Sequence, residues 1–216
     1  MDSVTGVGVL DKAMTVLHAV RSEPRSLQAL QQTTGLPRAT AHRLAAALEV
    51  HGLLRRDDDG RFELGHGLVA LGEAARERFP LVETARPILA DLRDETGEST
   101  QLFVVDGDRR RCVLSLETPH GLRWIVPVGS LFPLGAGSAG RVLAGETSKS
   151  GWIESIGERE SGVASVSAPV VDASGALLGA VSVSGPIERL SSTPGDRFGD
   201  AVVSAAHRLA ATTSPR

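Results

Sequence analysis

The stretch from residue 26 to residue 64 constrains the fold of this chain most strongly, because it predicts two short helices joined by a tight turn. Leu27 and Leu30 begin a short amphipathic helix. Gly35 interrupts it at a position suited to a left-handed turn. Pro37 then fits the first turn of a second helix, where its missing N–H costs nothing. This order of elements predicts a helix-turn-helix.

The second helix is expected to have one buried face and one polar face. Apolar residues recur at positions i, i+3, i+4 and i+7, namely Ala41, Leu44, Ala45 and Leu48. Four polar residues lie on or beside the opposite face: Arg38, Thr40, His42 and Arg43. The second helix of a helix-turn-helix enters the major groove of double-stranded DNA. We therefore expect Arg38 and His42 to reach base edges, and Thr40 and Arg43 to contact phosphates mainly.

A two-stranded wing is expected to follow the second helix. Gly52 ends that helix, Leu53 and Leu54 begin a strand, and Asp57–Gly60 supplies a hairpin turn. Three arginines flank the turn and suit phosphate contact: Arg55, Arg56 and Arg61. The same pattern also fits a three-helix packing unit with a solvated hairpin, and that interpretation stays open.

Composition limits the class of protein. The net charge of −3 argues against a nonspecific nucleic-acid coat, but it is compatible with a few arginines on one face of a sequence-specific DNA reader. Aromatic residues make up 3% of the chain and tyrosine is absent, which argues against stacking of single-stranded bases. The single cysteine, Cys112, excludes an intramolecular disulfide and fits the cytoplasm. No apolar run is long enough for a membrane span.

The remaining pattern predicts an α+β chain of several parts. A first helix covers residues 8–22, with an inner face expected at Val9, Leu10, Ala13, Val16, Leu17 and Val20. The winged helix-turn-helix domain is expected at 1–66, a linker helix at 67–80 and a second domain at 81–216. In the second domain, helices over 81–96 and 194–211 enclose strands within 99–117, 122–129 and 163–185.

Enzyme signatures are absent from the sequence. The GAGSAG segment at 135–140 has the wrong spacing for a dinucleotide loop, and no metal-protease motif occurs. Glu158 and Glu160 flank Arg159, which suggests a solvated or salt-bridged turn. Alternate serines, Ser165 with Ser167 and Ser182 with Ser184, put hydroxyls on one face of a sheet. They either bind a small polar ligand or fill a layer of small residues; no catalytic residue, metal or cofactor is expected.

Three blocks of the sequence resemble the IclR-type transcriptional regulators: residues 6–20 with 36–65, VPVGSLFPLGAGSAGRVLAG, and GERESGVASVSAPVVDASGALLGAVSVSGPIERL. The GVGVLDKA opening and IGERESGVASVSAPV look most similar to the actinobacterial branch that controls leucine and other amino-acid biosynthesis genes. The resemblance implies a winged helix-turn-helix, a linker helix and a GAF/PAS-like effector-binding domain. It also implies homodimers, which often pair into tetramers.

Carried over by motif, the resemblance implies an effector pocket for a small organic acid or amino acid, made by Trp124, Ser138, Ala139, Val163, Ser165, Ser182 and Ser184. Backbone N–H groups at Ser138 and Ala139, near a helix N-terminus, would suit a carboxylate. The implied function is a ligand-responsive repressor or activator that binds a double-stranded DNA operator. The alternative is a cytoplasmic small-molecule-binding signalling module whose winged helix contacts protein, and an enzyme ranks third.

One segment departs from the family pattern. Between Leu143 and Gly157, IclR-type relatives usually carry a longer stretch with an additional helix over the pocket, whereas this sequence has only AGETSKSGWIESI. An acidic pocket position of some members corresponds to about Ser155 here. We expect the sequence to join two ordered pieces across an unresolved loop somewhere in 144–152. The alternative is a true deletion that leaves the pocket open.

Overall fold

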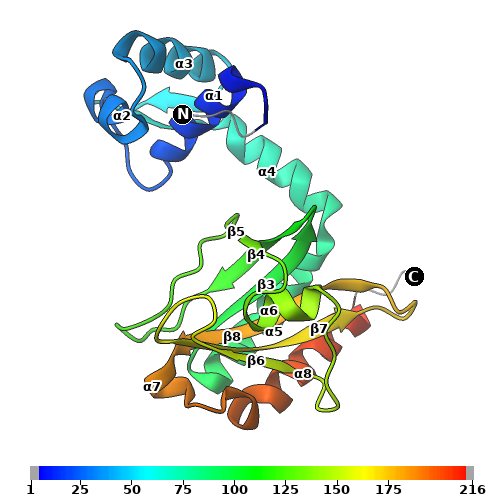
Figure 1. Ribbon diagram of the computed structural model, residues 1–216. Helices are drawn as coiled ribbons and strands as arrows, with labels where there is room; N and C mark the ends of the chain where they lie inside the picture. Colours follow the sequence, from blue (N-terminus) through cyan, green and yellow to red (C-terminus); the bar gives the residue numbers. More distant parts are fainter. Residues whose placement is uncertain (1–4, 213–216) are drawn as a thin grey trace. The chain divides into compact units, whose positions relative to one another are not determined.

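The structure, a computed structural model, describes residues 5–212, and it divides into two compact units between Arg78 and Phe79 (Figure 1). The ends of the two expected domains, residues 1–4 and 213–216, lie outside the described residues.

The N-terminal unit contains a helix-turn-helix followed by a hairpin. Its elements are α1 (Gly8–Ala19), α2 (Leu27–Thr34), α3 (Arg38–Val50), β1 (Leu54–Arg56), β2 (Phe62–Leu64) and α4 (Gly67–Arg78). The Ser26 hydroxyl caps α2 by accepting the Ala29 N–H at 3.2 Å. Gly35 ends α2 with φ of 67°, and its N–H donates to the Gln31 carbonyl at 2.9 Å. The glycine turn is therefore confirmed, while Pro37 lies just before α3 rather than in its first turn.

The core of this unit joins all three of its first helices to the hairpin. Leu30, Ala41, Ala45 and Phe62 are each fully buried in it, together with Val16 and Val20 near the end of α1. The expected inner face of α1 is wrong at its start, because Val9 is 66% and Leu10 is 52% exposed. The helix also ends at Ala19, three residues before the expected end at residue 22. The first turns of α1 therefore leave apolar side chains uncovered.

The C-terminal unit is built on one six-stranded antiparallel sheet with strand order β5-β4-β3-β8-β7-β6. Its elements are α5 (Pro80–Thr96), β3 (Ser99–Asp106), β4 (Arg109–Leu116), β5 (Leu131–Pro133), α6 (Gly137–Leu143), β6 (Ile153–Ile156), β7 (Val163–Val171), β8 (Leu177–Pro186), α7 (Ile187–Leu190) and α8 (Pro194–Thr212). Pro80 begins α5, where its fixed φ suits a first helical position.

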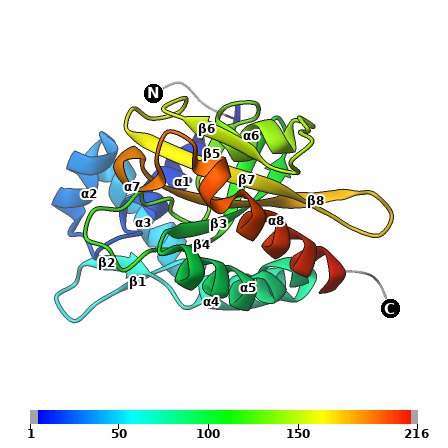
Figure 2. The same ribbon diagram turned by 90° about the horizontal axis from the view of Figure 1, so that it is seen from below.

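The two faces of the sheet carry different cores. Helices α5 and α8 lie side by side on one face (Figure 2), where Leu89, Val166, Val183 and Val202 belong to the main apolar cluster. The opposite face carries a smaller cluster that includes Phe103, Cys112, Ala139 and Val142, with α6 packed over it. Because side chains alternate along a strand, the serines between the valines of β7 and β8 point toward α6.

Two strands differ from the sequence expectation. Residues 122–129 form no strand, and the edge strand β5 follows them at Leu131–Pro133. Pro127 lacks the N–H that a sheet ladder needs, and Gly129 turns the chain with φ of 89°. Strand β6 has no counterpart in the sequence expectation, because it is only four residues long and is flanked by polar sequence.

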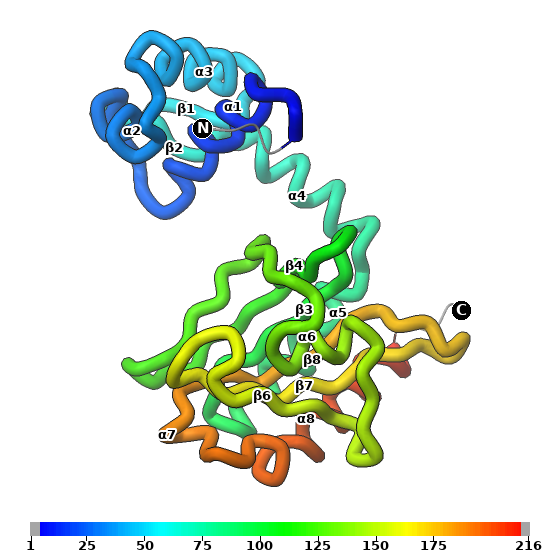
Figure 3. Tube along the Cα trace, viewed as in Figure 1, coloured from blue at the N-terminus to red at the C-terminus, as the bar shows by residue number. Residues whose placement is uncertain are grey.

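The segment between α6 and β6 is short and continuous, and it can be followed in Figure 3. The Glu146 N–H donates to the Arg141 carbonyl at 2.9 Å, and the Gly151 N–H donates to Ser148 at 3.2 Å. Trp152 then packs on α8 against Gly195 and Gly199. The expectation that residues are missing within 144–152 is therefore wrong.

Candidate functional site

The outer face of α3 is the first candidate site. Its buried stripe is confirmed, because Ala41, Leu44, Ala45 and Leu48 all lie in the core. Arg38, His42 and Arg43 are exposed and Thr40 is half-buried. Within residues 5–212, the side chains of Arg38, His42 and Arg43 have no hydrogen bond or ion pair. This helix therefore presents two uncommitted guanidinium groups and an imidazole to its surroundings.

The wing arginines are held by the chain itself. Arg55 forms an ion pair with Glu63, and Arg61 lies 2.7 Å from the Asp57 carboxylate. Arg56 stacks over Phe62 at 4.1 Å and donates to the Gly60 carbonyl at 3.1 Å. Exposed ion pairs of this kind contribute little and are screened by salt, so a phosphate can compete for these arginines.

The second candidate site is a small cavity of about 30 Å³ between the sheet, α6 and the β6–β7 connection. Six of the seven expected effector residues line it: Ser138, Ala139, Val163, Ser165, Ser182 and Ser184. Trp124 is not among the lining residues, but the guanidinium of Arg159, which does line the cavity, stacks on its ring at 5.3 Å. The structure thus brings the expected residues together around one space.

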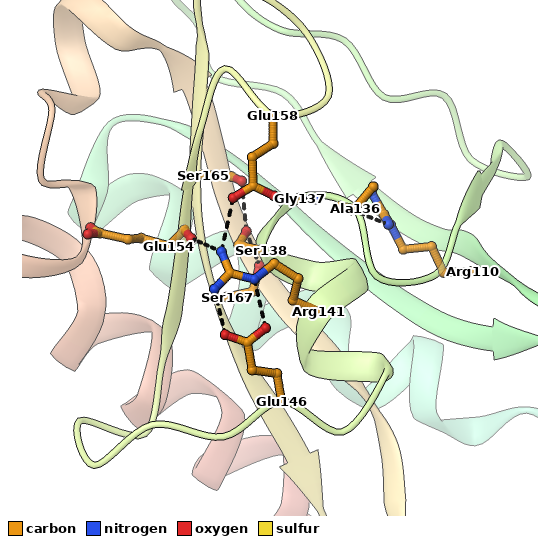
Figure 4. Close-up of polar contacts among 10 residues, drawn as sticks. All are labelled: Arg110, Ala136, Gly137, Ser138, Arg141, Glu146, Glu154, Glu158, Ser165 and Ser167. Atoms are coloured by element: carbon orange, nitrogen blue, oxygen red, sulfur yellow. Dashed lines mark hydrogen bonds and ion pairs between the residues drawn. The ribbon is translucent and has the colours of Figure 1, made fainter.

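Serine hydroxyls form a connected network in this cavity. The Ser138 Oγ lies 2.7 Å from the Ser165 Oγ and 2.8 Å from the Ser167 Oγ (Figure 4). The Ser167 hydroxyl donates to Ser182 at 2.9 Å, its cross-strand partner. No histidine is among the residues that line the cavity, so none is placed to activate a serine as a nucleophile. The arrangement suits hydrogen bonding to a polar ligand.

Arg110 is a cavity residue that sequence reasoning missed. The residue is 2% exposed, and its guanidinium donates to the Pro133 carbonyl at 2.5 Å and the Ala136 carbonyl at 2.6 Å. Burial and, to a smaller extent, the nearby charge of Arg159 together lower the pKa of Arg110 to about 10. The sequence did contain a signal for this residue. Three consecutive arginines occupy 109–111 of an expected strand, so the side chain of the middle one must point to the opposite face of the sheet from the other two.

Arg159 also points into the cavity, stacked at 4.4 Å on Phe132 and at 5.3 Å on Trp124. Burial lowers its pKa. Its neighbour Glu158 turns the other way, accepting the Gly137 N–H at 3.1 Å and lying 2.9 Å from Arg141 (Figure 4). The expected salt-bridged turn is therefore correct for Glu158, whereas Arg159 takes no part in it.

A second set of contacts fixes α6 above this cavity. Arg141 binds Glu146 through two nitrogens, at 2.8 Å and 2.5 Å, and donates to the Glu154 carbonyl at 3.1 Å. These contacts join α6 to the shortened segment and to β6 (Figure 4). The direct connection from α6 to β6 thus has its own ion-pair anchor.

We expect Gly140→Ala to loosen α6 from the sheet. A Cβ at position 140 would lie 2.1 Å from the Arg110 Nη1, which two carbonyls hold in place. Overpacking of this kind costs about 1–3 kcal/mol. Thermal unfolding followed by circular dichroism measures it, and Gly121→Ala, which meets nothing within 4 Å, serves as the control. Equal melting temperatures for the two variants would contradict this packing.

The described part of the chain contains no group of three or more histidine, cysteine, aspartate or glutamate residues that could hold a metal ion. Among the same residues, no helix is long and apolar enough to cross a membrane.

A winged helix-turn-helix in one unit and a small polar cavity in the other define the class of one-component transcription regulators. Comparison with known families agrees. Residues 9–58 match the IclR helix-turn-helix domain, and residues 73–148 and 145–211 match the C-terminal domain of the bacterial transcriptional regulator IclR. The chain belongs to the IclR family. It is a ligand-responsive, DNA-binding transcriptional regulator of a non-enzymatic family, and the α+β prediction with a GAF-like effector domain is confirmed.

Individual relatives span nearly the whole chain. The HTH-type transcriptional regulator BhcR of Paracoccus denitrificans is 26% identical over 98% of this chain and 89% of its own length. The transcriptional repressor IclR of Escherichia coli is 24% identical over 85% of this chain and 81% of its own. The two matches to the C-terminal domain overlap at residues 145–148, within the segment between α6 and β6.

Solved structures share the fold. The IclR protein of Thermotoga maritima has a TM-score of 0.75 at 19% identity and covers 95% of this chain and 98% of its own. An IclR homolog from Microbacterium hydrocarbonoxydans, solved with 4-hydroxybenzoate, has a TM-score of 0.75 at 18% identity and covers 94% and 98%.

Proposed function

We propose that this regulator binds its operator as a homodimer, through α3 and the wing, and that a small organic acid or amino acid in the α6 cavity controls the binding. The observation that carries the proposal is the uncommitted cationic face of α3 at Arg38, His42 and Arg43. A helix used for protein contact would expose apolar residues there instead, which disfavours the signalling-module alternative. The protein would work in the cytoplasm.

The individual DNA contacts follow from position on α3 and the wing. Arg38 and His42 project near the start of the recognition helix and are proposed to reach base edges. The residues proposed to contact DNA phosphates are Thr40, Arg43, Arg55, Arg56 and Arg61. The ion pairs of Arg55 and Arg61 within the wing must be exchanged for phosphate contacts on binding.

Arg38→Ala is expected to weaken operator binding by about 1–3 kcal/mol and to relax the preference at one base pair. Arg56→Ala is expected to weaken all sequences alike and to flatten the salt dependence, because it removes a phosphate contact. Fluorescence anisotropy with DNA upstream of the gene and of its neighbouring operon measures both. Arg208→Ala removes an exposed charge of the other unit and is the control. Operator affinity that is unchanged in both variants refutes the assignment.

The effector assignment rests on the cavity residues Ser138, Ser165, Ser182 and Ser184, with Ala139 and Val163 as other walls. Trp124 is proposed to take part through Arg159, which lines the cavity and stacks on its ring. A carboxylic acid bound to the Microbacterium homolog supports the ligand class. Calorimetry with branched-chain amino acids, their keto acids and methionine tests it, alongside Ser182→Ala and Ser184→Ala. An effector that loosens DNA must itself bind more weakly to the DNA complex.

Two further parts of the proposal have their own support. The homodimer is supported by exposed apolar side chains at the start of α1, including Val7, Val9 and Leu10. Sedimentation of a Val9→Glu variant tests this interface. Control of amino-acid biosynthesis genes, in the leucine branch, is supported by the GVGVLDKA and IGERESGVASVSAPV segments. Mapping the operator in the genome tests that assignment.

A further inference from the structure

The cavity under α6 has a surplus of hydrogen-bond donors. The amide nitrogen of Gln101, whose side chain is 1% exposed, has no acceptor among the described residues, and neither has the Arg110 Nε. The indole N–H of Trp124, whose ring stacks with Arg159, is a third buried donor without a partner among the described residues. Buried polar atoms are normally paired, and all three of these lack an acceptor. The missing partner is therefore rich in acceptor oxygens.

The same cavity holds two positive charges that no buried carboxylate neutralises. Arg110 and Arg159 both line it and both stack on Phe132, at 5.4 Å and 4.4 Å. The Arg110 guanidinium bonds only neutral carbonyls, and Glu158 is engaged by Arg141. Glu160 is the one carboxylate of the lining, and its side chain is exposed. Two like charges in a low-dielectric site are costly without a counter-charge.

The space is small. A cavity of about 30 Å³ holds roughly two water molecules, so a ligand of more than a few atoms must move the Arg159 side chain aside. That side chain is free to move, because it is held by ring stacking and by no ion pair or hydrogen bond within residues 5–212. A planar guanidinium can then bind two oxygens of one anionic group.

We propose that the effector is a compact dianion, a short dicarboxylate or a phosphate, whose two charges are shared between Arg110 and Arg159, and that Arg159 is the residue that selects for the second charge. This inference rests on the proposed effector role of the cavity. It narrows the ligand class, because an ammonium group would face two guanidinium groups and unpaired donors, which disfavours free amino acids.

The test is calorimetry on the full-length protein at constant ionic strength. Oxalate, malonate, succinate and inorganic phosphate are compared with acetate, propionate and butyrate as matched monoanions, and with malonamide as a neutral analogue. We expect at least one dianion to bind about tenfold or more tightly than its matched monoanion, since a charge-assisted contact is gained. Preference for phosphate over the dicarboxylates, or the reverse, identifies the source of the dianion.

Variants locate the selectivity. Arg159→Gln is expected to weaken the dianion about tenfold or more while changing the monoanion by less than about threefold, and Arg159→Lys to restore part of the preference. Arg208→Gln, which removes an exposed charge paired with Asp91, should leave both affinities unchanged. An unchanged melting temperature shows that Arg159→Gln remains folded.

The remaining outcomes overturn the inference. They are monoanions that bind as tightly as dianions, an Arg159→Gln variant that loses both classes equally, and no binding of any anion in the series. Operator binding is measured separately by anisotropy. A protein that binds its operator and responds to a neutral or monoanionic effector therefore refutes the dianion inference and leaves the proposed function standing.

Discussion

Gly65→Ala is expected to destabilise the N-terminal unit by about 3 kcal/mol or more. A Cβ at position 65 would lie 2.2 Å from the Gly52 carbonyl oxygen and 2.8 Å from that of Leu54. These are backbone atoms, and the Gly65 N–H is itself fixed to the Leu53 carbonyl at 2.9 Å, so neither side can yield. In a unit of this size, that loss lowers the melting temperature by roughly 10–20 °C. Circular dichroism melts and operator binding at 37 °C measure it.

A second glycine of the same unit is the matched control. Gly72 lies within α4, and a Cβ there would meet nothing within 4 Å. Gly72→Ala should therefore be neutral, or stabilising by about 0.5–1 kcal/mol, because alanine favours the helix. If Gly65→Ala melts within a few degrees of Gly72→Ala, the wing does not pack against Gly52 as described.

A comparison of Gly35 with Gly65 shows what local sequence can reveal and what it cannot. Gly35 was identifiable as a helix-ending turn because the pattern around it is local. The requirement at Gly65 comes from a backbone 13 residues earlier in the chain, brought close only by the fold. The buried stripe of α3 was predictable for the same reason as Gly35, because helical periodicity is written in adjacent turns.

The cavity residues also differ in whether local sequence could place them. Alternation along β7 and β8 placed Ser167 and Ser182 on one face, and their strands pair so that the two hydroxyls meet. Arg159 was read from its neighbours as part of a salt-bridged turn. Its direction is decided by Arg141, 17 residues from Glu158, which takes that carboxylate and leaves Arg159 to stack on Phe132. No local pattern contains that competition.

The shortened segment was misread because its apolar residue has a distant partner. Trp152 follows polar sequence and looked unaccompanied, which favoured missing residues. Its partner is α8, where Gly195 and Gly199 lie one turn apart and provide a flat surface for the indole ring. A pair of glycines in a helix was the available signal, since glycine within a helix usually has a packing reason.

Gly199→Ala is the second substitution with a large expected effect. A Cβ at 199 would lie 2.2 Å from the Trp152 indole nitrogen and 2.5 Å from its Cδ1, so the ring must leave α8. Loss of this packing is expected to cost about 2–4 kcal/mol, against which the better helix propensity of alanine returns about 1 kcal/mol. Chemical denaturation of the full-length protein measures the free energy of unfolding.

A double-mutant cycle separates this clash from a general effect on the helix. Once Trp152→Ala has removed the ring, Gly199→Ala has nothing to displace and should become neutral or stabilising by up to about 1 kcal/mol. The coupling energy between the two sites is then roughly 2 kcal/mol or more, well above the additivity error of about 0.5 kcal/mol for distant sites. Strictly additive effects would mean that Trp152 is not seated on Gly199, and the short connection from α6 to β6 would lose its anchor on α8.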